Sequence, residues 1–375
     1  MVYDCIVLGL GGVGSAALRA AAVRGWKTLG IEQFGVVHDR GSSHGQTRII
    51  RTAYFEHPDY VPLARRAWRA WEELQTECRQ PLVEKTGLLQ MGPPDGEVVQ
   101  GVLASAEQYG LTVDTLTPDE VILRFPAFKP APGQIGLFEE PAGFLRVETC
   151  VASLLKSARS AGATIVANAE VESFDVAANG VISLETTKGT YQAERLIVAA
   201  GPWTQRVLKE MDLHFKVIRK QQQWFQIDRV DTKWENGFPC YLFETEDGIF
   251  YGFPEIDRLG MKVAEHTGGE SVADPSGLDR ETNRNDQQRC EHFLDGHMNF
   301  TKRRLVHDSA CMYTMSPDGH FVIDRHPQID NVVFAGGMSG HGFKFLPVIA
   351  QQLVDLLDAK SDPLFDFLRM SGRDG

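Results

Sequence analysis

The sequence predicts an α/β protein whose two domains are interleaved along the chain. The chain opens with an apolar strand, a glycine-rich turn and a helix over residues 4–34, as a parallel nucleotide-binding sheet does. Two later apolar runs, 196–201 and 331–337, end in small residues and predict further buried parallel strands of that sheet. Between them, residues 216–255 are rich in aromatic and β-branched residues, which favours an antiparallel sheet in an α+β second domain.

Length and composition limit the class of protein. The 375 residues are enough for two packed domains, and 43% hydrophobic with 23% charged residues is typical of a soluble globular protein. A formal net charge of −12 argues against a nucleic-acid-binding surface. No apolar run reaches the roughly 20 residues of a membrane helix, and the early strand leaves no room for a signal peptide. The six cysteines are scattered, so we expect a reducing, cytoplasmic location without disulfides or zinc.

The opening turn carries a dinucleotide-binding fingerprint, in which Gly9, Gly11 and Gly14 stand in the pattern GxGxxG. The first glycine permits a tight turn, the second lets the backbone approach a pyrophosphate, and the third lets the helix pack on the strand. Glu32 ends the next strand, where a ribose-binding acid is expected. A purely structural turn is the alternative, and the fingerprint does not distinguish FAD from NAD.

Periodicity predicts the other elements. Apolar residues at helical spacing predict helices over 60–77, 97–108, 149–162 and 345–358, and short strands are expected at 88–91, 164–166, 169–174 and 181–186. Residues 274–295 are expected to form a helix with loops, and 125–132 a loop. Trp68 and Trp71 are expected in the core.

Two arginines, Arg48 and Arg51, follow a polar segment and would share one face if this stretch is helical. They form either a solvated basic face or an anion clamp, because a guanidinium group binds a carboxylate or phosphate with two hydrogen bonds.

Four other residues also have an ordinary interpretation. Cys311 could be a small buried apolar residue, and Lys262 a surface charge. His266 could be a structural histidine, and Lys344 the partner of a helix dipole. None of the four indicates a function when taken singly.

Together, these stretches resemble the monomeric sarcosine oxidase family of flavin amine oxidases, which includes N-methyltryptophan and L-pipecolate oxidases. The resemblance is carried over the whole chain by HGxTRIIRxAY from His44, YGFP from Tyr251, CMYT from Cys311 and SGHGFK from Ser339. It implies a Rossmann-type FAD-binding domain interleaved with an antiparallel-sheet substrate domain. The FAD-binding domain would comprise residues 1–80, 145–215 and 315–375, and the substrate domain 81–144 and 216–314.

The resemblance also implies the site residues. Cys311 would be joined through its sulfur to FAD, which is the expected cofactor. The other residues expected around FAD are Gly9, Gly11, Gly12, Val13, Gly14, Glu32, His44, Thr47, Arg48, Val171, Gly201, Gly340, Gly342 and Lys344.

For the substrate, Arg51 and Lys344 would bind a carboxylate. Tyr251 and His266 would position the amine, and Lys262 would promote the reaction with O₂. Tyr313 and Leu242 would line the pocket, and no metal is implied.

The implied reaction oxidises the C–N bond of a secondary amino acid to an imine and reduces O₂ to hydrogen peroxide. We expect sarcosine or a related N-alkyl amino acid as substrate, and a monomer with neither a nucleic-acid nor a membrane partner. Leu242, where sarcosine oxidases are expected to have Met, and Gln46, where others have Asp, leave L-pipecolate, L-proline and N-methyltryptophan open.

A flavin dehydrogenase that uses another electron acceptor and a non-enzymatic flavin-binding module are the remaining alternatives. The segment RGSSHGQTRIIR resembles peroxisomal relatives in particular, yet the chain lacks a Ser-Lys-Leu ending. A peroxisomal location would therefore require that a C-terminal signal had been removed.

Overall fold

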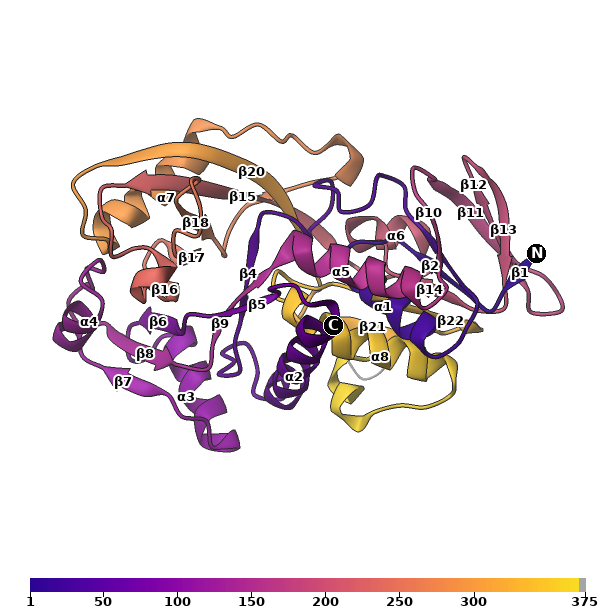
Figure 1. Ribbon diagram of the computed structural model, residues 1–375, viewed down its shortest axis with the longest axis horizontal. Helices are drawn as coiled ribbons and strands as arrows, with labels where there is room; N and C mark the ends of the chain where they lie inside the picture. The colour runs from indigo at the N-terminus through magenta and orange to yellow at the C-terminus, as the bar shows by residue number, and fades with distance from the viewer. Residues whose placement is uncertain (371–375) are drawn as a thin grey trace.

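A six-stranded sheet with the order β10-β3-β2-β14-β22-β21 lies at the centre of one half of the molecule (Figure 1). The computed structural model describes residues 1–370. Residues 371–375, which end the last predicted segment of the FAD-binding domain and include the C-terminal tripeptide, lie outside the described residues. All neighbouring strands of this sheet are parallel except the last pair. The strands are β2 (Cys5–Leu8), β3 (Thr28–Ile31), β10 (Thr164–Val166), β14 (Leu196–Val198), β21 (Val322–His326) and β22 (Ile329–Gly336).

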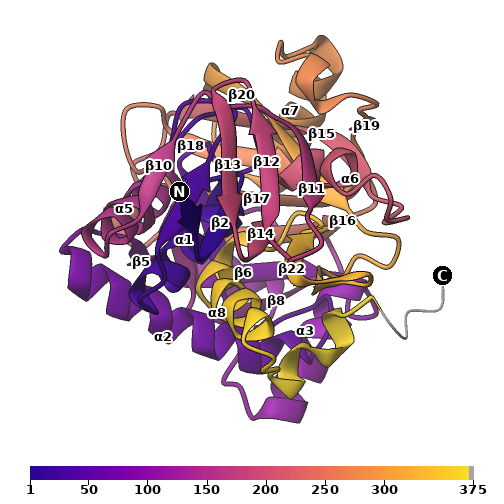
Figure 2. The same ribbon diagram turned by 90° about the vertical axis from the view of Figure 1, so that its right-hand side faces the viewer.

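Both faces of this sheet are covered (Figure 2). Cys5 and Val7 of β2 pack into one core with the helices, whereas Ile6 and Leu8 pack against a small second sheet, as the alternation of side chains along a strand requires. The helices are α1 (Gly12–Val23), α2 (Tyr60–Cys78), α5 (Val147–Ser160) and α8 (Leu346–Leu357). The small sheet consists of β1 (Val2–Tyr3), β11 (Val171–Val176), β12 (Ile182–Thr186) and β13 (Gly189–Ala193).

A nine-stranded, largely antiparallel sheet forms the other half, toward the left of Figure 1. Phe243, Phe250 and Val263 point to the face covered by α7 (Arg284–His297), and Leu242, Tyr251 and Ala264 point to the opposite face. Its strands are β6 (Leu88–Gly92), β7 (Asp114–Leu116), β8 (Ile135–Glu139), β15 (Lys216–Ile227), β16 (Cys240–Thr245), β17 (Gly248–Phe253), β18 (Met261–Glu265), β19 (Glu270–Ser271) and β20 (Arg303–Met315).

A three-stranded sheet adds β4 (Thr47–Ile50), β5 (Val83–Lys85) and β9 (Gly143–Arg146). The remaining elements are α3 (Glu97–Tyr109), α4 (Pro118–Arg124), α6 (Thr204–Val207) and the 3₁₀ turns η1 (Gly201–Trp203), η2 (Trp234–Asn236), η3 (Pro275–Gly277), η4 (Phe343–Phe345) and η5 (Pro363–Leu368).

The predicted α/β class is confirmed, and the long predicted helices correspond to α2, α3, α5 and α8. The helical interpretation of the Arg48 segment is wrong, because Thr47–Ile50 pairs antiparallel with Gly143–Arg146 as a strand. The β-branched pair Ile49 and Ile50 suits a pleated surface better than a helix. Trp71 is buried as expected, whereas Trp68 lies only partly buried at the edge of the core.

Over residues 1–370, no helix combines the length and apolar character needed to cross a bilayer. The same residues contain no cluster of His, Cys, Asp and Glu that could hold a metal ion, and all six cysteines are free thiols.

Candidate active site

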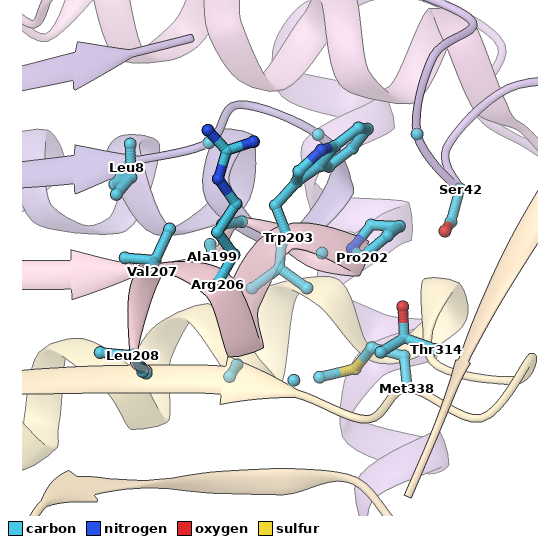
Figure 3. Close-up of a pocket in the computed structure, with 18 of the residues that line it drawn as sticks. Leu8, Ser42, Ala199, Pro202, Trp203, Arg206, Val207, Leu208, Thr314 and Met338 are labelled. Atoms are coloured by element: carbon cyan, nitrogen blue, oxygen red, sulfur yellow. The ribbon is translucent and has the colours of Figure 1, made fainter. Parts of the chain in front are cut away.

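A cavity of about 580 Å³ opens beyond the carboxyl ends of β2 and β14. In Figure 3, Leu8 and Val207 lie toward one end of it, Ser42 and Thr314 lie toward the other, and Pro202 and Trp203 lie between them. This position is where open parallel sheets bind nucleotides, and the volume is typical of a ligand site.

The glycine-rich turn forms the base of this larger cavity. Gly9 has a φ of +84°, and a Cβ on Gly14 would lie 1.7 Å from the carbonyl oxygen of Gly9. Helix α1 starts after Gly11 without an acid in its first turn, and its Gly12 N–H donates to Ser43 Oγ at 3.0 Å. Its positive end therefore suits a phosphate.

Glu32 lines the larger cavity although it is only 3% exposed. Its Oε2 accepts from the Leu10 N–H at 2.7 Å and its Oε1 from the Phe34 N–H at 3.0 Å. These bonds fix the carboxylate and leave it further lone pairs for a sugar hydroxyl.

Most of the predicted cofactor residues surround the larger cavity. Those in its wall are Gly9, Gly11, Gly12, Val13, Glu32, Arg48, Val171, Gly201, Gly340 and Gly342. Gly14 packs beneath the turn, and Lys344 lies in a second cavity. Thr47 lies with its hydroxyl and carbonyl near Lys262.

Cys311 is in the wall of neither cavity, but its Sγ lies 3.5 Å from Arg48 Nη2 and 3.7 Å from the Ser42 carbonyl oxygen, and both of these residues line the larger cavity. Burial by itself raises the thiol pKa, but His44, Arg48 and Lys262 outweigh it and lower the pKa to about 6. The buried thiols of Cys240 and Cys290 differ, because burial raises the pKa of each to about 12. Cys311 is thus a thiolate near neutral pH and suited to covalent chemistry.

His44 lies close to Cys311 and is another of the predicted cofactor residues. Its side chain is buried, and its Nε2 has no hydrogen-bond partner among residues 1–370. Buried polar atoms are nearly always paired, so this nitrogen is compatible with a cofactor partner, although His44 is in the wall of neither cavity.

A second, smaller cavity of about 50 Å³ adjoins the first. Arg48, Tyr313, Gly340 and Phe343 line both cavities, which are therefore contiguous. The sheet register and η4 bring together most of the predicted catalytic and substrate residues in the smaller cavity, namely Arg51, Leu242, Tyr251, His266, Tyr313 and Lys344.

Arg51 is held by a side chain that sequence reasoning missed. Its Nη2 donates to both carboxylate oxygens of Glu56, at 2.7 and 2.6 Å, and its guanidinium lies over the rings of Tyr54 and Phe55. Burial opposes ionisation of Glu56, but Arg51, His341 and Lys344 outweigh it and lower its pKa to about 2. A carboxylate is thus already bound where one was expected from a substrate.

Lys344 is the second cation of the smaller cavity. Its Nζ donates to the carbonyl oxygen of His341 at 2.8 Å and to the Tyr54 hydroxyl at 3.3 Å. Burial, with a smaller contribution from Arg51, lowers its pKa to about 7, although Glu56 opposes the shift. The ammonium therefore titrates close to neutral pH.

The polar groups on the sheet side of the smaller cavity are neutral. Burial lowers the pKa of His266 to about 4, and its Nδ1 lies 3.4 Å from the Tyr313 hydroxyl. Burial raises the pKa of both Tyr251 and Tyr313. Because none of these three groups is charged, they can form hydrogen bonds with an uncharged amine.

Lys262 and Gln46 are outside the walls of both cavities. Lys262 is in the wall of neither cavity and donates instead to the carbonyl oxygens of Gly45 and Thr47. The Gln46 side-chain amide forms hydrogen bonds with Trp224 and Asp257 and does not line a cavity. The residue at position 46 therefore gives no direct information on the size of the substrate.

Comparison with known proteins identifies the family. Residues 4–356 match the family described as FAD dependent oxidoreductase. The chain belongs to this family. FAD is therefore its cofactor, in agreement with the larger cavity.

Its relatives include the monomeric sarcosine oxidase of Bacillus sp. (strain B-0618), which is 37% identical over 359 residues, covering 94% of this chain and 92% of that protein. The N-methyl-L-tryptophan oxidase of Salmonella agona is 37% identical over 377 residues, covering 98% and 97%. Among solved structures, NikD, described as an unusual amino acid oxidase, superposes with a TM-score of 0.85 at 22% identity, covering 98% and 97% of the two chains. Glycine oxidase from Geobacillus kaustophilus superposes at 0.81 and 19% identity, covering 100% and 99%.

Three further residues of the site escaped sequence reasoning, namely Glu56, His341 and Tyr54. His341 and Tyr54 stand inside the quoted motifs, and Tyr54 Oη lies 2.6 Å from His341 Nδ1. Glu56 lies five residues after Arg51, and no local spacing rule marks it.

Proposed function

We propose that this protein is an oxidase of secondary amino acids that uses FAD and O₂, with sarcosine or a related N-alkyl amino acid as substrate. The observation that carries the proposal is the convergence of Arg51 and Lys344 in a small cavity contiguous with the larger one. The names of the two relatives support this substrate class.

The smaller cavity provides a carboxylate site and an amine site. Arg51 and Lys344 bind the substrate carboxylate, in the place where Arg51 now holds Glu56. Two cations in a buried cavity attract a carboxylate far more strongly than surface charges do. Arg51 therefore exchanges one carboxylate for another and stays paired, whereas Glu56 loses its guanidinium partner when substrate binds.

Neutral His266, Tyr251 and Tyr313 position the substrate amine in its uncharged form. Phe55 and Phe343, in the wall of the cavity, exclude water from it. FAD, when bound, accepts the two electrons of the C–N oxidation and passes them to O₂, which yields hydrogen peroxide.

We also assign Cys311 as the covalent attachment point of FAD and Lys262 as the residue that promotes the reaction with O₂. The low thiol pKa of Cys311 and the position of the Lys262 amine beside Thr47 support these roles. The proposed division is an FAD-binding domain (residues 1–80, 145–215 and 315–375) and a substrate domain (81–144 and 216–314). We further propose that the protein is a monomer and is located in the cytoplasm.

The decisive experiment measures hydrogen peroxide release with sarcosine, L-pipecolate, L-proline and N-methyltryptophan. We expect the highest kcat/KM with sarcosine or another small N-alkyl amino acid, because the smaller cavity is narrow. Turnover of none of the four with oxygen, together with no bleaching of the flavin by them under anaerobic conditions, would contradict the proposal. Bleaching without peroxide would instead indicate a dehydrogenase that uses another acceptor.

A further inference from the structure

Lys262 is the middle member of a row of three side chains that crosses the nine-stranded sheet. In the sheet register it pairs with Trp224 of β15 on one side and with Phe253 of β17 on the other. Directly paired residues project to the same face of a sheet. Its Nζ accordingly lies 5.1 Å from the Trp224 ring centroid and 5.0 Å from that of Phe253. Both distances are within the roughly 6 Å of a cation–π contact.

Backbone oxygens close the slot between the two rings. Lys262 Nζ donates to the Gly45 carbonyl oxygen at 2.6 Å, and it lies 3.2 and 3.4 Å from the carbonyl and hydroxyl oxygens of Thr47. Lys262 is 2% exposed, and Trp224 and Phe253 are 1% exposed. None of the carboxylates in residues 1–370 forms an ion pair with this ammonium. The ring faces and these oxygens therefore take the place of a counter-ion.

Gln46 fixes the Trp224 ring in this position. The indole Nε1 donates to Gln46 Oε1 at 2.7 Å, and Gln46 Nε2 donates to Asp257 Oδ2 at 2.8 Å. Gln46 stands between Gly45 and Thr47, whose carbonyl groups receive the lysine, and it adopts a φ of +66°. The ring of His307 packs on Trp224 with centroids 4.9 Å apart. One residue thus ties the indole to the backbone that holds the lysine.

The charges that face Lys262 make such support necessary. Burial and the guanidinium of Arg48 lower the pKa of Lys262 well below its ordinary value. Glu148, Cys311 and Cys240, which face it from α5, β20 and β16, raise it and do not compensate. An ammonium in this place needs stabilisation that involves no ion pair, and an aromatic slot supplies it.

We propose that Trp224, with Phe253, is a positioning residue that keeps Lys262 protonated and fixed beside Thr47. This inference rests on the role in the O₂ reaction proposed above for Lys262. The inference adds a requirement to that role: Lys262 promotes the reaction with O₂ only when it is an ammonium group held between the two rings. Trp224 itself makes no contact with substrate.

The test compares Trp224→Phe and Trp224→Leu with Lys262→Met. Each purified holoenzyme is reduced anaerobically with substrate and then mixed with O₂, from about pH 6 to about pH 10. For Trp224→Leu we expect normal flavin reduction, but reoxidation whose rate declines with rising pH at a midpoint about one pH unit below that of the parent protein. Without the ring, the pKa of Lys262 is lower still, so the ammonium is lost at lower pH. Trp224→Phe keeps a ring and should stay close to the parent.

A second readout does not depend on turnover. Urea unfolding midpoints of the parent, Trp224→Leu, Lys262→Met and the double variant form a double-mutant cycle. We expect the Trp224→Leu change to lower the midpoint more with Lys262 present than with Met, and this difference to shrink at high pH. A purely packing role for Trp224 predicts a coupling that does not change with pH.

Trp26→Leu is the matched control, because the Arg195 guanidinium lies 4.7 Å above that indole and neither residue lines the two cavities. It should leave the pH profile of reoxidation unchanged. Should Lys262→Met reoxidise normally, the proposed role of Lys262 is wrong. If Lys262→Met reoxidises slowly while Trp224→Leu keeps the pH profile of the parent protein and shows no pH-dependent coupling to Lys262, only the inference about Trp224 is wrong. If Trp224→Leu does not fold, a Trp224→Phe protein that loses O₂ reactivity as Lys262→Met does would also overturn it.

Discussion

The two adjoining cavities differ in what forms them: main-chain groups at the base of the larger one and side chains in the smaller one. Glycines and main-chain groups form the base of the larger one, where Gly9 and Gly14 allow backbone segments to meet. Charged side chains define the smaller one, where Arg51 and Lys344 are buried beside the partly exposed Glu56. At Gly9 and Gly14 the main chain leaves no room for an added Cβ, whereas the side-chain site can accept a substitution and changes its chemistry instead.

This difference predicts the largest effect at Gly14. In Gly14→Ala the new Cβ would lie 1.7 Å from the Gly9 carbonyl oxygen, and neither backbone segment can yield easily. We expect loss of bound FAD, measured as flavin absorbance per protein. Gly35→Ala is the control, because its Cβ would meet nothing within 4 Å. Full flavin content in the Gly14 variant would show that the turn has more room than its geometry indicates.

Covalent attachment of the flavin is expected to depend on the Cys311 side chain. In Cys311→Ala, flavin should bind but should separate from acid-precipitated protein, whereas in the parent it should stay with the pellet. Cys290→Ala, remote from the cavity and with a raised pKa, is the control. Flavin retained in the pellet of the Cys311 variant would exclude this attachment point.

In the smaller cavity we expect a change of affinity rather than loss of the cofactor. In Arg51→Lys the two-pronged guanidinium is lost, so KM should rise by roughly 100-fold with flavin content unchanged. The surface pair Arg66 and Asp362 offers the control Arg66→Lys, which should leave KM unaltered. An unchanged KM in Arg51→Lys would separate Arg51 from carboxylate binding.

The pH dependence of carboxylate binding should report on Lys344. Its pKa is lowered to about 7, so the ammonium is present below that pH and lost above it. The inhibition constant of a simple carboxylate such as acetate should therefore rise with pH above 7, by up to about tenfold per pH unit. In Lys344→Met this dependence should disappear. A pH-dependent constant that persists in the variant would assign the titration to another group.

The smallest effect is expected outside both cavities. Thr117 caps α4 in a capping box with Glu120, and Thr117→Ala should lower the free energy of unfolding by about 1 kcal/mol. Flavin content and KM should stay the same. Thermal unfolding measures the first effect, and an altered KM would show that α4 is coupled to the site.

The main-chain cavity could be predicted from the sequence because its signal is local. Gly9, Gly11, Gly14 and Glu32 fall within one strand–helix–strand unit, and the structure places them around one cavity or directly beneath it. The smaller cavity has no local signal. Its members come from β4, β16, β17, β20 and η4, and motif resemblance rather than spacing indicated them.

Two details lay beyond sequence reasoning for physical reasons. Arg48 and Arg51 would lie on opposite faces of a continuous strand, but β4 ends at Ile50 and the chain turns, so both reach the smaller cavity. The contact of Lys262 with Trp224 and Phe253 depends on the pairing register of three strands, which is set by long-range packing.

The order of strands in the parallel sheet has a consequence for biosynthesis. β14 lies between β2 and β22, so residues 5–8, 196–198 and 329–336 meet side by side. Sheets closed by such distant segments form slowly, because the long loops must be ordered before their contacts contribute. A ribosome releasing this chain from its N-terminus exposes the glycine turn early but completes the sheet only near the end of translation. The nascent protein therefore passes most of its synthesis with an unpaired sheet edge, and it can acquire its flavin only once almost all of the chain has emerged.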